Sequence, residues 1–232
     1  MSLVGLLIGL SLLLLVPAVQ NYAGQKGQEW FNDKYETGLQ LQGLRYVFPN
    51  KAVLHGIYVP DHHGDTLISA ARAEFSFFSV SQSKNHLRAG EIELQDFLLR
   101  VRAYQGEDGS SFDKFIERLK PDVPKSDVPP FKMTTSRIAI DRGTFDYKSY
   151  KCDSCTQYLL RDLTMRVGNF RLNGQEASGD VRKLAFNDKY GLHIVNFSAR
   201  AGYFKNQIVA HNLHLQSSRS LIEGDIRLRY NN

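Results

Sequence analysis

The alternating apolar patterns of this chain change phase part-way along, which restricts the folds open to it. Ile92 and Leu94 occupy one phase, whereas Phe97 and Leu99 occupy the opposite one. Side chains of a β-strand alternate strictly between the two faces of a sheet, so a strand changes phase only at a β-bulge or a tight turn. The sequence therefore predicts such an irregularity near Gln95-Asp96.

The same pattern recurs along the chain and predicts a mainly β protein. Ile138 to Tyr147 and Leu163 to Leu172 each change phase after a polar pair. Short apolar stretches separated by Gly, Asn or Asp turns are typical of an all-β meander. The 14 Phe and 11 Tyr agree with this, because aromatic residues favour strands. One helix is expected at Ser110 to Lys120, where Ser110 suits the N-cap and Asp113 the N3 position.

The first residues of the chain are almost entirely apolar. No charged residue precedes Lys26, and Leu3 to Val19 is interrupted only by Gly, Ser and Pro. As a helix, this stretch is near the lower limit for crossing the ~30 Å hydrocarbon core of a bilayer. We expect a signal-anchor helix. A signal peptide cleaved near Val16-Pro17-Ala18 is the alternative, whereas a buried core helix is disfavoured because the stretch has no polar face. The side chains expected in the membrane are Leu3, Val4, Leu6, Leu7, Ile8, Leu10, Leu12, Leu13, Leu14, Leu15 and Val16.

The chain divides into five expected segments. Residues 1–22 are the membrane anchor, and residues 23–38 are a juxtamembrane amphipathic helix. Residues 39–120 are a first β unit that includes the short helix 110–120. Residues 121–130 are a Pro-rich linker, and residues 131–232, which contain no proline, are a continuing β array.

The aromatic residues after the anchor allow two interpretations. Tyr22, Ala23, Trp30 and Phe31 recur at spacings that suit one side of a helix. They lie either at the level of the lipid headgroups, where amphipathic rings collect, or beneath the first strands.

No group of residues predicts catalysis, so we expect no enzyme, no catalytic residue, no cofactor and no metal site. The segment Cys152-Asp153-Ser154-Cys155 lies in an expected hairpin loop, where a plain loop or a local disulfide is favoured over a metal site or a redox pair. His62-His63 lies in a turn and is expected to be solvated. His211 and His214 are expected on opposite faces of a strand. The net charge of +5 comes from scattered Lys and Arg, which does not predict nucleic-acid binding.

One series of segments runs through nearly the whole chain. It consists of the apolar run that leads into Pro17-Ala18-Val19-Gln20, then Val53 to Asp61, Gly64 to Ile68, Ile92 to Asp96, the Asp108-Gly109-Ser110 turn with its short helix, the Pro-rich spacer and Ile138 to Gly143. Together these segments resemble the start of TamB-type proteins of the AsmA-like superfamily, in their Bacteroidetes-like variant.

The resemblance implies a location and a function. Members are anchored in the inner membrane by the N-terminal helix and extend a long β-sheet, folded into a groove, through the periplasm. They are implicated in moving phospholipid toward the outer membrane and in outer-membrane protein assembly. This chain would then be a single-pass inner-membrane protein with most of its residues in the periplasm. It lacks the basic residues expected before the anchor and is far shorter than a complete member, so we expect it to hold the membrane-proximal end.

The expected fold is an N-terminal transmembrane helix followed by an elongated, curved antiparallel β-sheet that forms an open groove, with one or two short helices. One short helix is too little to cover the apolar face of such a sheet, so we expect that face to accept phospholipid acyl chains. The side chains expected to line it are Ile92, Leu94, Phe97, Leu99, Val101, Ile138, Ile140, Phe145, Leu163, Met165 and Val167. The alternative is a membrane-tethered scaffold that binds an outer-membrane assembly factor of the Omp85 type by strand addition.

Overall fold

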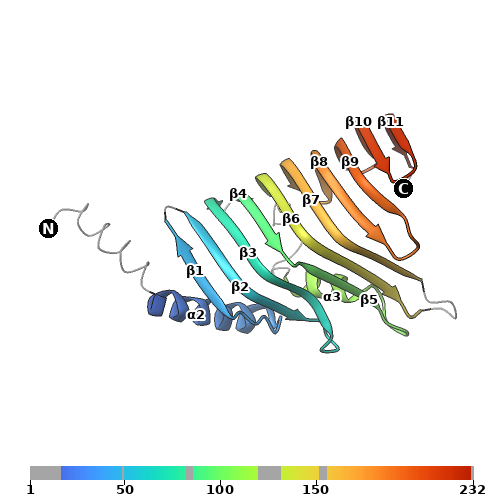
Figure 1. Ribbon diagram of the computed structural model, residues 1–232. Coiled ribbons are helices and arrows are strands. Elements are labelled where there is room, and N and C mark those ends of the chain that lie inside the picture. The colour runs from blue at the N-terminus through green and yellow to red at the C-terminus, as the bar shows by residue number, and fades with distance from the viewer. Residues whose placement is uncertain (1–16, 49, 82–85, 120–131, 152–155, 231–232) are drawn as a thin grey trace.

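A computed structural model describes residues 17–48, 50–81, 86–119, 132–151 and 156–230. These residues form one sheet of 11 strands with two helices beside it (Figure 1), so the predicted mainly β class is confirmed. The helices are α2 (Pro17–Tyr35) and α3 (Ser111–Arg118). The strands are β1 (Gly43–Val47), β2 (Lys51–Pro60), β3 (Thr66–Ser81), β4 (His86–Gln95), β5 (Leu98–Ala103), β6 (Lys132–Ser149), β7 (Gln157–Asn173), β8 (Glu176–Asp188), β9 (His193–Phe204), β10 (Gln207–Ser217) and β11 (Leu221–Arg229).

The strands follow one another across the sheet in chain order, with β5 as the exception. The order is β1-β2-β3-β4-β6-β7-β8-β9-β10-β11. Both β4 and β5 pair with β3 on one side and with β6 on the other, so they are two halves of one strand interrupted at Asp96-Phe97. Strands on both sides of the predicted linker 121–130 therefore belong to the same sheet.

The prediction of a purely antiparallel sheet is wrong at one place. Both β4 and β5 pair with β6 in parallel, whereas all other neighbours are antiparallel. Parallel neighbours need a crossover connection, because the chain must return to the end of the sheet from which it started. Here the chain leaves β5 through α3 before β6 begins at Lys132.

The predicted changes of phase coincide with residues of left-handed backbone. Asp96 has a φ of 51°, Arg142 a φ of 54° and Asn169 a φ of 51°. The β6–β7 register shifts on both sides of Gly143, and the β7–β8 register shifts next to Asn169. One inserted residue with positive φ is a common way to build a bulge, so the irregularities predicted from the phase changes are confirmed.

The predicted short helix is confirmed together with its cap. The backbone N–H of Asp113 donates to Ser110 Oγ at 3.3 Å, and the N–H of Ser110 donates to the Asp113 carboxylate at 2.7 Å. This reciprocal pair is a capping box and satisfies two N–H groups at the start of α3.

Helix α2 begins at Pro17, inside the segment predicted as the anchor, and ends at Tyr35. The side of α2 that faces the sheet is polar. Side chains spaced by multiples of four residues along this side form hydrogen bonds with the backbone near β1. Gln20 donates to the carbonyl of Tyr46 at 3.3 Å. Gln28 accepts from the N–H of Leu41 at 2.8 Å, and Asn32 accepts from the N–H of Leu39 at 2.7 Å.

Two aromatic side chains of α2, those of Tyr22 and Trp30, are exposed, whereas that of Phe31 is half-buried. Tyr22 is 63% exposed and Trp30 is 58% exposed, so the interpretation that these two rings pack beneath the first strands is wrong. Their placement at lipid headgroups stays a prediction.

The predicted anchor residues, Leu3 to Val16, lie outside the described residues, as do the linker and the two cysteines. Neither helix in the described part of the chain is both long and apolar enough to cross a bilayer. The transmembrane helix therefore stays a prediction.

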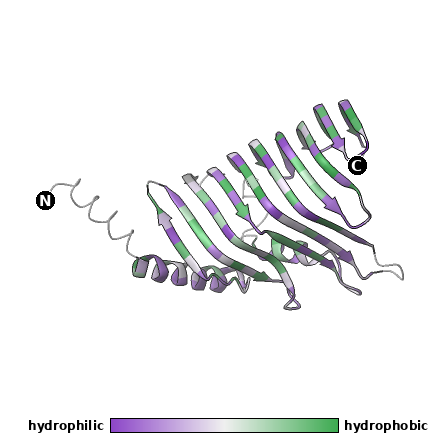
Figure 2. Cartoon of the chain, viewed as in Figure 1, coloured by the Kyte–Doolittle hydropathy of each residue, from purple (hydrophilic) through white to green (hydrophobic). Residues whose placement is uncertain are grey.

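Burial is concentrated in the first half of the sheet. Leu67 and Ala73 of β3 have no exposed surface, and Val53 of β2 is nearly as deeply buried. By contrast, every residue of β11 is exposed. Apolar and polar residues alternate along many strands (Figure 2), which is the pattern of a sheet whose two faces differ in chemistry.

Candidate functional site

One face of the sheet carries an uninterrupted row of apolar side chains. Directly paired residues of neighbouring strands project to the same face, so the row can be followed through the register. From β1 to β11 it consists of Leu44, Leu54, Ala73, Leu94, Ile140, Met165, Leu184, Phe197, Leu215 and Ile222. We call this set the long apolar row. Because neighbouring strands lie ~4.8 Å apart, it extends for roughly 43 Å.

A second row lies beside the first on the same face. It consists of Tyr46, Ala52, Phe75, Ile92, Ile138, Val167, Val181 and Ala199. We call the face that bears both rows the apolar face.

Most of the residues predicted to line a groove lie on this apolar face. Six of them belong to the two rows: Ile92, Leu94, Ile138, Ile140, Met165 and Val167. Beyond the bulges, Leu163 pairs with Gly143, and Phe145 pairs with Leu99. Each bulge adds one residue, which compensates for the change of phase in the sequence. The side chains of Leu163, Phe145 and Leu99 therefore lie on the apolar face. Val101, two residues after Leu99, lies on the same face. Phe97 lies between β4 and β5 and is half-buried.

Helix α2 covers the β1 end of the apolar face. A Cβ atom on Gly24 would lie 2.9 Å from Leu44 Cβ, which is too close, so only glycine allows this approach. The second helix adjoins the first, because Arg118 of α3 donates to the carbonyl of Glu36 at 2.8 Å. The hydroxyl of Ser111 accepts from the N–H of Arg102 at 2.9 Å, which attaches the start of α3 to β5.

The apolar face becomes more exposed toward β11. Among the described residues, the main helix contacts are those of α2 with β1 and of α3 with β5. Ile222, Ile226 and Leu228 of the last strand are 53%, 42% and 58% exposed. Their partners Leu215, Ala210 and Ile208 in β10 place all three on the apolar face.

The opposite face is polar. Arg166, which follows Met165 in β7, donates to the Asp141 carboxylate at 2.5 Å and to the carbonyl of Ile140 at 2.9 Å. Arg137 lies 3.0 Å from Glu93 across the β4–β6 pair. Such ion pairs keep this face hydrated. The sheet therefore has one polar face and one apolar face, which suit different kinds of ligand.

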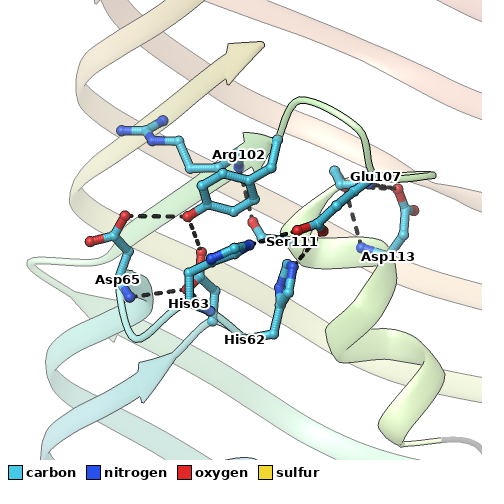
Figure 3. A network of polar contacts seen from close by, with 10 residues as sticks. His62, His63, Asp65, Arg102, Glu107, Ser111 and Asp113 are labelled. Atoms are coloured by element: carbon cyan, nitrogen blue, oxygen red, sulfur yellow. Dashed lines mark hydrogen bonds and ion pairs between the residues drawn. The ribbon is translucent and has the colours of Figure 1, made fainter. Parts of the chain in front are cut away.

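A cluster of polar side chains joins the β2–β3 turn to the segment after β5 (Figure 3). Glu107 bridges two imidazoles: its Oε2 lies 2.6 Å from His62 Nε2, and its Oε1 lies 2.6 Å from His63 Nε2. The hydrogen bonds from His63 and His62 hold the pKa of the Glu107 carboxyl below its usual value. His63 is exposed, in agreement with the predicted solvation, whereas His62 is half-buried, and the contact of both imidazoles with Glu107 was not predicted.

Tyr104 and Asp61 hold the turn that carries the two histidines. Tyr104 donates to Asp61 Oδ2 at 2.7 Å, and its ring lies 4.0 Å from the ring of His63. The pKa of Tyr104 is raised by burial and by the hydrogen bond to Asp61. The other carboxylate oxygen of Asp61 accepts from the N–H groups of His63 and Asp65, at 2.9 and 3.0 Å.

The sequence shows the two histidines but not their partner. Glu107 lies 44 residues beyond His63, and only the pairing of β5 with β3 brings the two segments together. In the sequence, Glu107 lies next to a Gly-rich turn, and nothing in that pattern distinguishes it from a solvated carboxylate.

The prediction for His211 and His214 is wrong. A register shift at Asn212, where φ is 52°, places both on the polar face. Each contacts a different carboxylate: His211 lies 3.6 Å from Asp225, and His214 lies 2.9 Å from Glu223.

The resemblance to TamB-type proteins rests on the sequence segments named above. Comparison of the chain with family models, with curated proteins and with solved structures finds no match.

Proposed function

We propose that this protein is anchored in the inner membrane and uses the apolar face of its periplasmic sheet to carry phospholipid acyl chains toward the outer membrane. The long apolar row is the observation that carries the proposal. It crosses ten strands without a polar residue, and it is most exposed at its β11 end, away from the strands β1 and β5 that the described helices mainly contact.

The length and chemistry of the row support an aliphatic ligand. One leaflet contributes ~15 Å to the hydrocarbon core of a bilayer, so a row of roughly 43 Å accommodates more than one acyl chain length. Each methylene removed from water contributes about 0.8 kcal/mol. An acyl chain that lies against Met165, Leu184 and Phe197 therefore recovers part of the hydrophobic free energy that it loses on leaving the bilayer.

The remaining features suit a conduit that performs no reaction. The headgroup of a lipid would stay in water beside the sheet, and no side chain needs to form or break a bond. The exposed rings of Tyr22 and Trp30 suit the headgroup level of a membrane next to α2. The proposal therefore includes no enzymatic activity and no cofactor.

Lipid co-purification tests the proposal. Protein purified from membranes is extracted, and bound phospholipid is measured by mass spectrometry for the wild type, Leu184→Glu and Lys183→Glu. Leu184 belongs to the long apolar row, whereas Lys183 precedes it in β8 and is exposed on the polar face. We expect Leu184→Glu to lose most of the lipid and Lys183→Glu to retain it, with both variants folded by circular dichroism. Absence of phospholipid from the wild type would refute the proposal.

The position of β11 at the edge of the described sheet favours one second candidate function. In the described part of the chain, β11 pairs only with β10, and all its residues are exposed. An edge strand of this kind can accept a strand of a partner, such as an outer-membrane assembly factor of the Omp85 type. This function predicts disulfide crosslinks from cysteines placed at Arg227 and Arg229 to alternate residues of one partner strand. Crosslinks without a regular register would exclude strand addition.

A further inference from the structure

We propose that His62, His63 and Glu107 bind a divalent transition-metal ion, with Zn²⁺ as the best fit. The ligand atoms of the three side chains all lie within 4.8 Å of one another. Among the described residues, no other group of histidine, cysteine and acidic side chains meets this condition. The site does not involve the apolar face, so a test of metal binding does not depend on whether the protein transports lipid.

The donor set selects the class of metal. Two imidazole nitrogens and one carboxylate are the protein ligands of many zinc sites, and they leave a fourth position for water. Imidazole is a poor ligand for Ca²⁺ and Mg²⁺, which prefer oxygen. His62 Nε2 lies 2.6 Å from Glu107 Oε2 and His63 Nε2 lies 2.6 Å from Glu107 Oε1, so the three side chains already bring their donor atoms together. Ligand atoms about 2.0–2.1 Å from a tetrahedral ion lie farther apart than this, so the Glu107 carboxylate would move back slightly as the ion enters.

The surrounding residues hold the ligands in place before any ion binds. Asp61 fixes the turn by accepting from the N–H groups of His63 and Asp65, and its own N–H donates to the carbonyl of Asp65 at 2.7 Å. The ring of Tyr104 packs against both histidines, with ring centroids 5.5 Å from His62 and 4.0 Å from His63. This packing and the hydrogen-bonded turn limit the orientations of the two imidazoles before an ion binds, which lowers the entropic cost of binding.

The site is open on one side. The side chains of His62, Glu107 and His63 are 19%, 30% and 46% exposed, so an ion and a water molecule can reach the ligand atoms. A hollow beside His62 and Glu107 continues to Lys114, Glu117 and Arg118 of α3. A bound ion would join the β2–β3 turn to the connection between β5 and α3, and would thereby fasten α3 to the sheet.

Zinc titration tests the site. The full chain carrying Cys152→Ser and Cys155→Ser is used as the parent protein, so that thiolates do not contribute, and any purification tag is removed. Isothermal titration calorimetry with Zn²⁺ is expected to show one ion per chain with a Kd of about 1 µM or tighter. His63→Gln and Glu107→Gln are each expected to weaken binding by about tenfold or more.

His214→Gln is the matched control, because His214 also contacts a carboxylate, Glu223 at 2.9 Å, but lies outside the cluster. This variant is expected to bind Zn²⁺ as tightly as the parent protein. The X-ray absorption spectrum of the zinc-loaded parent protein is expected to show nitrogen and oxygen ligands at about 2.0–2.2 Å. Zn²⁺ should also raise the Tm of the parent protein but not that of folded His63→Gln. Equal affinity in the parent protein and the cluster variants, or no binding by the parent protein, would overturn the proposal.

Discussion

Arg142 donates two parallel hydrogen bonds to the carboxylate of Asp96, from Nε to Oδ1 at 2.7 Å and from Nη2 to Oδ2 at 2.9 Å. Both residues have left-handed backbone, and the N–H of Asp96 also donates to the carbonyl of Asp141 at 3.0 Å. The hydrogen bonds from Arg142 lower the pKa of the Asp96 carboxyl. The bulges of two neighbouring strands are therefore joined directly, which keeps their phase changes in step and their apolar residues on one face.

The left-handed backbone at Arg142 predicts a difference between two substitutions. Arg142→Val and Arg142→Gly both lose the ion pair with Asp96, but only glycine adopts a φ of 54° without strain. We expect Arg142→Val to have a free energy of unfolding about 1 kcal/mol lower than that of Arg142→Gly. Urea denaturation of the two variants measures this difference. Equal stability would show that the bulge does not require this backbone conformation.

The bulges also show how much of the fold can be predicted from the sequence. The phase change between Leu94 and Phe97 predicts an irregular strand because alternation is a local property. The parallel pairing of β4 and β5 with β6 is not local: it depends on the path of the chain through α3, which no periodicity records. The contact of Glu107 with the two histidines could not be predicted from the sequence either, because it depends on the same path of the chain.

The buried pair of Arg102 and Asp146 predicts a large effect on stability. Arg102 Nη2 donates to Asp146 Oδ2 at 2.5 Å, and both residues are about nine-tenths buried or more, at 9% and 8% exposed. Asp146→Asn leaves the buried Arg102 guanidinium without an opposite charge. We therefore expect the free energy of unfolding to fall by about 3 kcal/mol. The double variant Arg102→Met, Asp146→Leu is expected to recover much of this loss. A double variant no more stable than Asp146→Asn would contradict this account.

The same pair predicts a pH dependence. Burial alone raises the pKa of Asp146, but hydrogen bonds from Arg102 and Gln157 and the charges of Arg102 and Arg100 outweigh it, and the net pKa is lowered. The contribution of Asp146 to stability is therefore complete above its unfolded pKa of about 3.9 and is lost as the pH falls through the lower folded pKa. We expect the stability difference between the wild type and Asp146→Asn to shrink from pH 6 toward about pH 2. A difference that stays constant over this range, measured by urea denaturation, would exclude the lowered pKa.

The contact between α2 and β1 predicts that Gly24 tolerates no larger residue. A Cβ atom there would lie 2.9 Å from Leu44 Cβ and would push the helix away from the sheet. We expect Gly24→Leu to increase amide hydrogen exchange in residues 39–47, whereas Gly27→Leu, at a position with no neighbouring atom within 4 Å, does not. Equal protection in both variants would show that α2 does not need this close approach.

In the proposed function, lipid contacts the apolar face of the sheet and not the polar face. The most direct measurement places a photo-crosslinking amino acid at Leu184 in one variant and at Lys183 in another, which are neighbours in β8 on opposite faces of the sheet. After irradiation in vesicles that contain labelled phospholipid, we expect label on the Leu184 variant and little on the Lys183 variant. Equal labelling of both positions, or none at Leu184, would contradict the account.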